Sequence, residues 1–128
     1  MIDIDRRFYS GILNFENNSE EISFLSHLST AMKLSKESLR EIKAYLADKP
    51  VNKAYLFGSY GRGDAAESSD VDILVELDYS QRIGLLFVQM KLDLENHIHK
   101  EVDLVSANGV SKYLQPAIDR EKILIYAR

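Results

Sequence analysis

Two aspartates, Asp70 and Asp72, lie two positions apart at the start of an apolar run. This run ends at Val75. The run has the composition of a buried strand, and side chains alternate along a strand, so both carboxylates point to one face. Two like charges a few Å apart repel by about 4 kcal/mol at an effective dielectric constant near 20. A divalent cation would reverse the sign of that cost. The pair therefore predicts a cation site, with a solvated strand edge as the alternative.

A glycine-rich segment precedes this pair. Residues 58–63 read Gly-Ser-Tyr-Gly-Arg-Gly and follow the apolar run 51–57, which predicts a strand that enters a tight turn and a short helix. Glycine has no Cβ, so such a turn can bring backbone N–H groups close to a phosphate. An ordinary strand-to-helix turn is the alternative. Arg62 either reaches a phosphate or pairs with Asp64 or Glu67.

The composition limits the classes of function. The 128 residues, of which 45% are hydrophobic and 28% charged, fit one ordinary globular domain. The absence of cysteine rules out disulfides and thiolate zinc sites and fits a cytoplasmic location. No apolar run approaches the roughly 20 residues of a membrane span, so no membrane partner is expected. The net charge of −4 argues against general nucleic-acid binding, which needs a basic surface.

Together, the glycine-serine turn and the Ser-Asp-Val-Asp run of residues 69–72 resemble the core pattern of the polymerase-β-like nucleotidyltransferases. The short chain is similar to the minimal nucleotidyltransferase (MNT) branch, whose members are antitoxins paired with HEPN-domain toxins. The resemblance covers residues 51–128. It implies a nucleotidyltransferase fold with a mixed sheet of about four strands and flanking helices.

The resemblance also assigns roles to individual residues. It implies that Asp70, Asp72 and Asp103 hold two Mg²⁺ ions, and that Asp103 accepts the proton of the attacking hydroxyl. Gly58 and Ser59 would contact the triphosphate of the substrate, which the family resemblance favours as ATP. No phosphate loop of the Walker type and no Ser-His-Asp or thiol nucleophile set competes with this assignment. His27, His97 and His99 are expected at surfaces or helix ends, and Tyr60 is expected to pack on the domain.

The apolar periodicity predicts alternating helices and strands, hence an α/β or α+β fold with a single sheet. Helices are expected over residues 19–32, 35–48, 80–98 and 110–114, and strands over residues 51–57, 71–77, 101–105 and 121–126. We expect a helical extension at residues 1–34, packed on the domain or contacting a partner, and the nucleotidyltransferase domain at residues 35–128. Leu85, Val88 and Leu92 form a second apolar stripe on the helix 80–98, either buried within the fold or facing a partner.

By resemblance, the expected reaction is transfer of AMP from ATP to a tyrosine of a HEPN toxin, which would make the chain an antitoxin. The 128 residues leave no room for the helical acceptor domain of related enzymes, so a partner or a second copy of the chain would supply the acceptor. Two alternatives stay open. One is an antitoxin that masks its partner without catalysis, and the other is a homodimeric nucleotidyltransferase acting on a small molecule such as an antibiotic.

Overall fold

The computed structural model describes residues 33–128. The helix predicted over residues 19–32 and His27 lie outside these described residues, as does nearly all of the extension 1–34. The division into an extension and a domain therefore stays a prediction.

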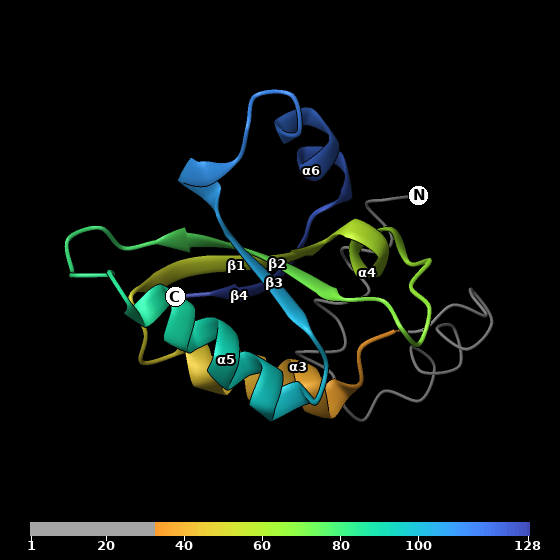
Figure 1. Cartoon of the computed structure of the whole chain (residues 1–128), viewed down its shortest axis with the longest axis horizontal. Helices are drawn as coiled ribbons and strands as arrows, with labels where there is room; N and C mark the ends of the chain where they lie inside the picture. Colours follow the sequence, from red (N-terminus) through yellow and green to blue (C-terminus); the bar gives the residue numbers. More distant parts are fainter. Residues whose placement is uncertain (1–32) are drawn as a thin grey trace.

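A four-stranded sheet forms the centre of the described part, with the spatial order β3-β2-β1-β4 (Figure 1). The strands are β1 (Val51–Phe57), β2 (Val71–Leu77), β3 (Val102–Ser106) and β4 (Ile123–Ala127). β2 pairs in parallel with β3, whereas β1 is antiparallel to both β2 and β4. The sheet is thus mixed, as the resemblance implied. The ranges predicted for β1 and β2 are confirmed, and β3 and β4 begin one and two residues later than expected.

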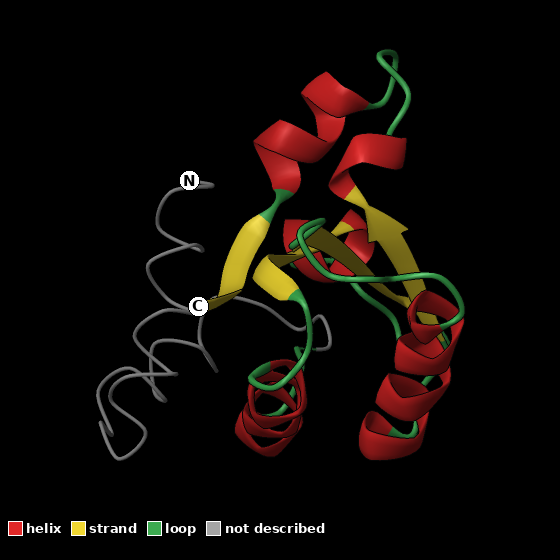
Figure 2. Ribbon diagram, turned by 90° about the vertical axis from the view of Figure 1, so that its left-hand side faces the viewer, coloured by secondary structure: helices red, strands yellow, loops and turns green. Residues whose placement is uncertain are grey.

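Helices lie on both sides of this sheet. Figure 2 shows two long helices below it, α3 (Lys36–Leu46) and α5 (Leu86–Ile98), and shorter helical segments above it. The upper segments are α4 (Gly58–Arg62), the 3₁₀ helix η1 (Ala107–Gly109) and α6 (Gln115–Glu121). Among residues 33–128 no helix combines the length and the apolar character needed to cross a membrane.

The first of these helices, α3, forms as its sequence predicts. The side chain of Ser35 accepts a hydrogen bond from the backbone N–H of Ser38 at 3.0 Å, which caps the helix. Leu39, Ile42 and Leu46 are buried at helical spacing beneath the sheet. The helix ends before Pro50, which cannot continue it. This packing fixes the lower face of the sheet.

Two predicted helices were wrong in their bounds. α5 begins at Leu86 rather than at residue 80, because Asp78 accepts hydrogen bonds from the backbone N–H and the hydroxyl of Ser80 and holds a turn there. Gly84 follows at φ +47°, outside the helical region. No helix forms over residues 110–114, where one was predicted. The 3₁₀ helix η1 ends before this segment, and α6 begins after it. Pro116 lies in the first turn of α6, where proline starts a helix rather than breaking one.

The two stripes of α5 have different environments. Met90, Leu94 and Ile98 are buried under the sheet. The second stripe is exposed: Leu85, Val88 and Leu92 expose 86%, 53% and 49% of their surfaces. The interior alternative is therefore excluded within the described residues.

Leu94 and Leu92 offer a matched test of this packing, since they lie on one helix but on opposite sides of it. Leu94 is fully buried, so Leu94→Ala should lower the free energy of unfolding by about 2–5 kcal/mol. Leu92→Ala should change it by less than about 0.5 kcal/mol. Urea unfolding followed by circular dichroism measures both values. Similar losses for the two variants would contradict the orientation of α5.

Candidate active site

The glycine-serine turn packs against Asp72, the aspartate within β2. Gly58 begins α4 at φ +63°, a conformation that glycine adopts without strain. A Cβ added at Gly58 would collide with Oδ2 of Asp72 and lie 3.1 Å from its Cγ. The carboxylate of Asp72 therefore sits directly over the backbone of the turn. Only glycine leaves room for it, so the turn and the carboxylate form one site.

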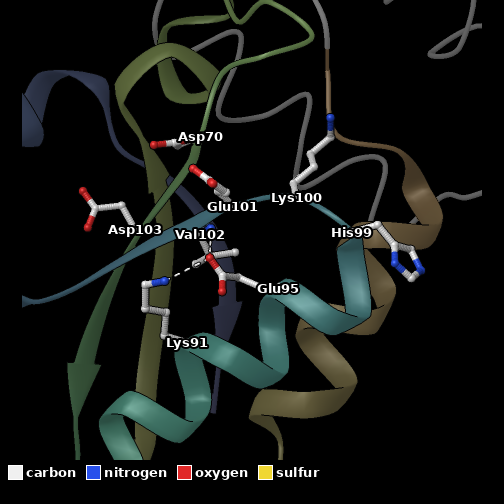
Figure 3. Close-up of a pocket in the computed structure, with 8 residues that line it drawn as sticks. All are labelled: Asp70, Lys91, Glu95, His99, Lys100, Glu101, Val102 and Asp103. Carbon is white, nitrogen blue, oxygen red and sulfur yellow. Dashed lines mark hydrogen bonds and ion pairs between the residues drawn. The ribbon is translucent and has the colours of Figure 1, made fainter.

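Strand register brings a second carboxylate alongside. Asp72 on β2 is the direct partner of Asp103 on the parallel strand β3. Neighbouring strands lie about 4.8 Å apart, and partners in register point to the same face. Asp70 lies two positions before Asp72, just ahead of β2. Because side chains alternate along an extended chain, Asp70 and Asp72 are expected on the same face of the sheet. Figure 3 shows the side chains of Asp70 and Asp103 on the same side of β3, away from α5. The backbone thus brings the three predicted aspartates to one corner of the sheet.

Within residues 33–128, the charges at this corner are balanced only in part. Burial raises the pKa of Asp72 to about 6, and repulsion from Asp103 and then Asp70 adds to the shift. The positive charge of Arg62 opposes it only in part. The side chains of Asp70 and Asp103 have no hydrogen-bond or ion-pair partner within residues 33–128, and both are exposed. A site of this kind favours any ligand that brings positive charge.

This donor set suits Mg²⁺, which prefers carboxylate oxygens together with phosphates and water. The described residues nevertheless contain no group of three acidic or histidine side chains already gathered closely enough to hold a metal ion. The backbone positions are set by the strands, whereas the side chains would have to turn toward a shared cation. The residues fit the metal in their chemistry and placement, and the metal site itself stays a prediction.

Arg62 and Ser59 flank the turn. Nε of Arg62 lies 3.2 Å from Oδ2 of Asp64, and Nη1 lies 3.3 Å from Oε1 of Glu121. The pairing with Asp64 is one of the two alternatives given by the sequence, while Glu121 could not be foreseen because it is 59 positions away. The hydroxyl of Ser59 has no hydrogen-bond partner in the described part of the chain. It is free to meet a ligand.

The remaining candidates take structural places. Tyr60 is fully buried, which confirms that it packs on the domain, and its hydroxyl has no partner among the described residues. His97 and His99 are exposed at the end of α5, as expected. The sequence did not reveal a cavity of about 700 Å³ beside Asp70 and Asp103, lined also by Lys91, Glu95 and Lys100. Only the fold brings α5 next to the start of β3, so no local signal could have shown it.

Comparison with known proteins gives one consistent result. The model of the family described as polymerase beta, nucleotidyltransferase, matches residues 40–128. A predicted protein adenylyltransferase of Methanocaldococcus jannaschii is 37% identical over 87 residues, which are 68% of this chain and 92% of that protein. The protein adenylyltransferase MntA of Thermococcus cleftensis is 35% identical over 75 residues, covering 59% of this chain and 75% of that protein.

Solved structures agree with the fold. The structure of a predicted minimal nucleotidyltransferase is 31% identical, with a TM-score of 0.61, and the match covers 74% of this chain and 98% of that one. A toxin–antitoxin structure with AMP-PNP gives a TM-score of 0.61 at 24% identity, over 70% of this chain and 73% of that one. The second likeness, at this identity, shows a shared fold alone.

Gly58→Ala tests the contact between the turn and Asp72. The added methyl group would collide with the carboxylate, and the positive φ that the turn requires is strained for any residue with a Cβ, so the variant should lose at least about 1 kcal/mol of stability. Gly109→Ala is the matched control, because a Cβ there meets nothing within 4 Å. Thermal unfolding compares the two. Equal melting temperatures would contradict the close approach of Asp72.

The raised pKa of Asp72 predicts how stability changes with pH. Because the folded protein binds this proton more tightly than the unfolded chain, the contribution to stability is present below pH 4 and is lost as pH rises through about 6. Asp72→Asn should therefore stabilise the protein at pH 8, by about 1–2 kcal/mol after allowance for partial solvent exposure.

Asp48→Asn is the control for this variant. Asp48 pairs with Lys49, which lowers the pKa of Asp48, so its substitution should not stabilise the protein. Urea unfolding at pH 4, 6 and 8 measures the difference. The same stability for Asp72→Asn and the unchanged protein at every pH would refute the electrostatic description of the corner.

Proposed function

The chain belongs to the polymerase beta nucleotidyltransferase family, and we propose that it is a protein adenylyltransferase that transfers AMP from ATP to a hydroxyl group of a partner protein. The acceptor we favour is a tyrosine of a HEPN-domain toxin, which would make the chain the antitoxin of a pair. We place the reaction in the cytoplasm, which suits a chain without cysteine.

The observation that carries this proposal is the position of Asp72. Its carboxylate is in register with Asp103 and lies over Gly58 at the glycine-serine turn. A phosphate at the turn would therefore lie beside uncompensated carboxylates. That arrangement is unfavourable for the protein alone and is useful where a metal-bound triphosphate is the substrate.

Asp70, Asp72 and Asp103 are the residues that would hold magnesium, with two ions as the expected number. When bound, the metal would neutralise phosphate charge and strengthen the electrophile. Oxygen donors of this kind also suit other divalent cations, such as Mn²⁺ and Ca²⁺. The requirement for magnesium is part of the proposal.

The reaction itself asks mainly for positioning and for charge stabilisation. The backbone at Gly58 and the free hydroxyl of Ser59 would hold the triphosphate. The acceptor oxygen attacks the α-phosphorus, a new P–O bond forms, and the bond to pyrophosphate breaks. The proton of the acceptor hydroxyl passes to the exposed carboxylate of Asp103, which is therefore the general base. Arg62, held by Asp64 and Glu121, would lie beside the departing charge.

The proposal of a protein acceptor draws on the relatives. The Methanocaldococcus jannaschii protein is matched over 92% of its length, so the similarity is not confined to one module of a much larger enzyme. That protein and the Thermococcus cleftensis relative are both named as protein adenylyltransferases. The HEPN toxin as partner rests on the resemblance of the sequence motifs to MNT antitoxins.

A second candidate is an antitoxin that works by masking alone. The exposed stripe Leu85, Val88 and Leu92 favours it, because contiguous apolar side chains at a surface are typical of a protein contact. Binding through this stripe and catalysis at the aspartates can also coexist. The two candidates differ in whether the aspartates are needed.

The decisive experiment mixes the protein with labelled ATP, Mg²⁺ and the product of the neighbouring gene, which we expect to be a HEPN-domain protein. We expect label on the partner. The double variant Asp70→Ala/Asp72→Ala should lower the rate of transfer by at least ~10²-fold, the effect of removing a group that stabilises a transition state. Asp48→Ala, which changes an exposed aspartate in the connection between α3 and β1, is the control and should retain transfer.

Mass spectrometry of the partner identifies the modified residue. Transfer that survives the double substitution would refute the assigned site. If the double variant transfers nothing but still neutralises the partner in cells, masking provides the biological effect.

A further inference from the structure

A polar groove of about 700 Å³ passes around the outer edge of β3 and is lined by residues on both sides of that edge, those of α5 among them (Figure 3). Asp70 and Asp103 lie at one end of it, and His99 and Lys100 lie at the other. Neither Gly58 nor Ser59 lines it. The groove therefore begins at two of the proposed catalytic carboxylates and leads away from the phosphate turn.

The floor of the groove is already paired. Oε2 of Glu95 accepts hydrogen bonds from the backbone N–H of Val102 at 3.0 Å and from Nζ of Lys91 at 2.9 Å, drawn as dashed lines in Figure 3. The hydrogen bond from Val102 and then that from Lys91 lower the pKa of Glu95. Glu95 thus accepts the first backbone N–H that points outward from the edge strand β3, and it neutralises the charge of Lys91. The floor is a fixed surface without net charge.

The far end of the groove differs from the floor. Nζ of Lys100 has no ion-pair partner within residues 33–128, although four carboxylates line the same groove. His99 beside it ends α5 at φ +56°, the only non-glycine residue of the described chain with a positive φ. Glycine is the usual residue there, and a side chain costs backbone strain. An unpaired cation and a strained histidine therefore meet at one end of the groove.

We propose that this groove binds the acceptor segment of the partner protein. The attacking hydroxyl lies at the Asp103 end, and an acidic side chain of the same segment lies on Lys100 and His99. The inference rests on the proposed adenylyl transfer and adds a recognition rule to it. Asp103 in β3 and Lys100 in the bend before it are three residues apart, so their Cα atoms lie at most about 10 Å apart. An extended peptide covers that length in about three residues, so the acidic residue follows or precedes the tyrosine by about three positions.

The test uses two synthetic peptides as acceptors. Each contains one tyrosine in a Gly-Ser background, and they differ only in Asp or Asn three positions from the tyrosine, on both sides. With labelled ATP and Mg²⁺, we expect kcat/KM to be roughly fivefold higher for the Asp peptide, the effect of one exposed ion pair. The difference should lie in KM, because Lys100 is a positioning residue that does not touch the reacting atoms.

Variants of the full chain assign the preference to the groove. Lys100→Gln should abolish the preference for the Asp peptide, whereas Lys43→Gln, at an exposed lysine on α3, should retain it. His99→Gly should weaken the preference and also raise the melting temperature, because it relieves the strain at positive φ. A merely structural role for His99 would leave the preference unchanged.

The outcomes separate this inference from the proposed function. Equal use of both peptides, a preference that survives in Lys100→Gln, or modification of the HEPN partner without either peptide would each overturn the groove as the acceptor site. The adenylyltransferase proposal would stand in all three cases. Failure of transfer to the partner and to both peptides would instead refute the proposed function.

Discussion

The electrostatic cost of holding the Asp72 carboxylate half-buried beside two other carboxylates is the constraint around which the candidate site is built. Parallel pairing of β2 with β3 sets Asp72 opposite Asp103, and the turn at Gly58 closes over the same carboxylate. Burial and the two neighbouring charges raise the pKa of Asp72 to about 6. The folded domain therefore holds this corner in a state that is worse for the protein than an apolar corner would be. A ligand that carries positive charge would recover that free energy, so binding of such a ligand is coupled to the electrostatic cost of this corner.

The opposite face of the sheet makes this arrangement tolerable. Val71 and Ile73 flank Asp72 in the chain, point the other way, and are fully buried above α3 and α5. A shift of one residue in the register of β2 would send both apolar side chains into solvent and the carboxylates into the core. The large cost of that shift exceeds the repulsion at the corner. The hydrophobic core thus fixes the position of Asp72 without touching its carboxylate.

The sequence predicted the elements whose causes are local. The bounds of β1 and β2 follow from neighbouring residues and are confirmed. The helix expected over residues 35–48 forms as α3, and its cap at Ser35 and its buried stripe are local features as well. The start of α5 was wrong because the Asp78 side chain stabilises a competing turn. Partners distant in the chain could not be predicted at all. Glu121 reaches Arg62 across 59 positions, and the groove exists only because α5 packs beside the start of β3.

In the proposed function, this domain positions the groups for nucleotidyl transfer, and a partner protein supplies the acceptor. Nucleotidyl transfer needs a phosphate cradle and positioned charges, and two strands with one turn provide positions for both. Selecting an acceptor needs surface that extends beyond those strands. Among residues 33–128 that surface is uncovered: the groove beside β3 ends at Lys100, which has no ion-pair partner there, and the stripe of α5 exposes Leu85 and Val88. An acceptor segment in the groove would bring hydroxyl and carboxylate together while the rest of its protein covers the stripe. Specificity would then arise from the area buried on binding, and reactivity from the corner that the fold already holds.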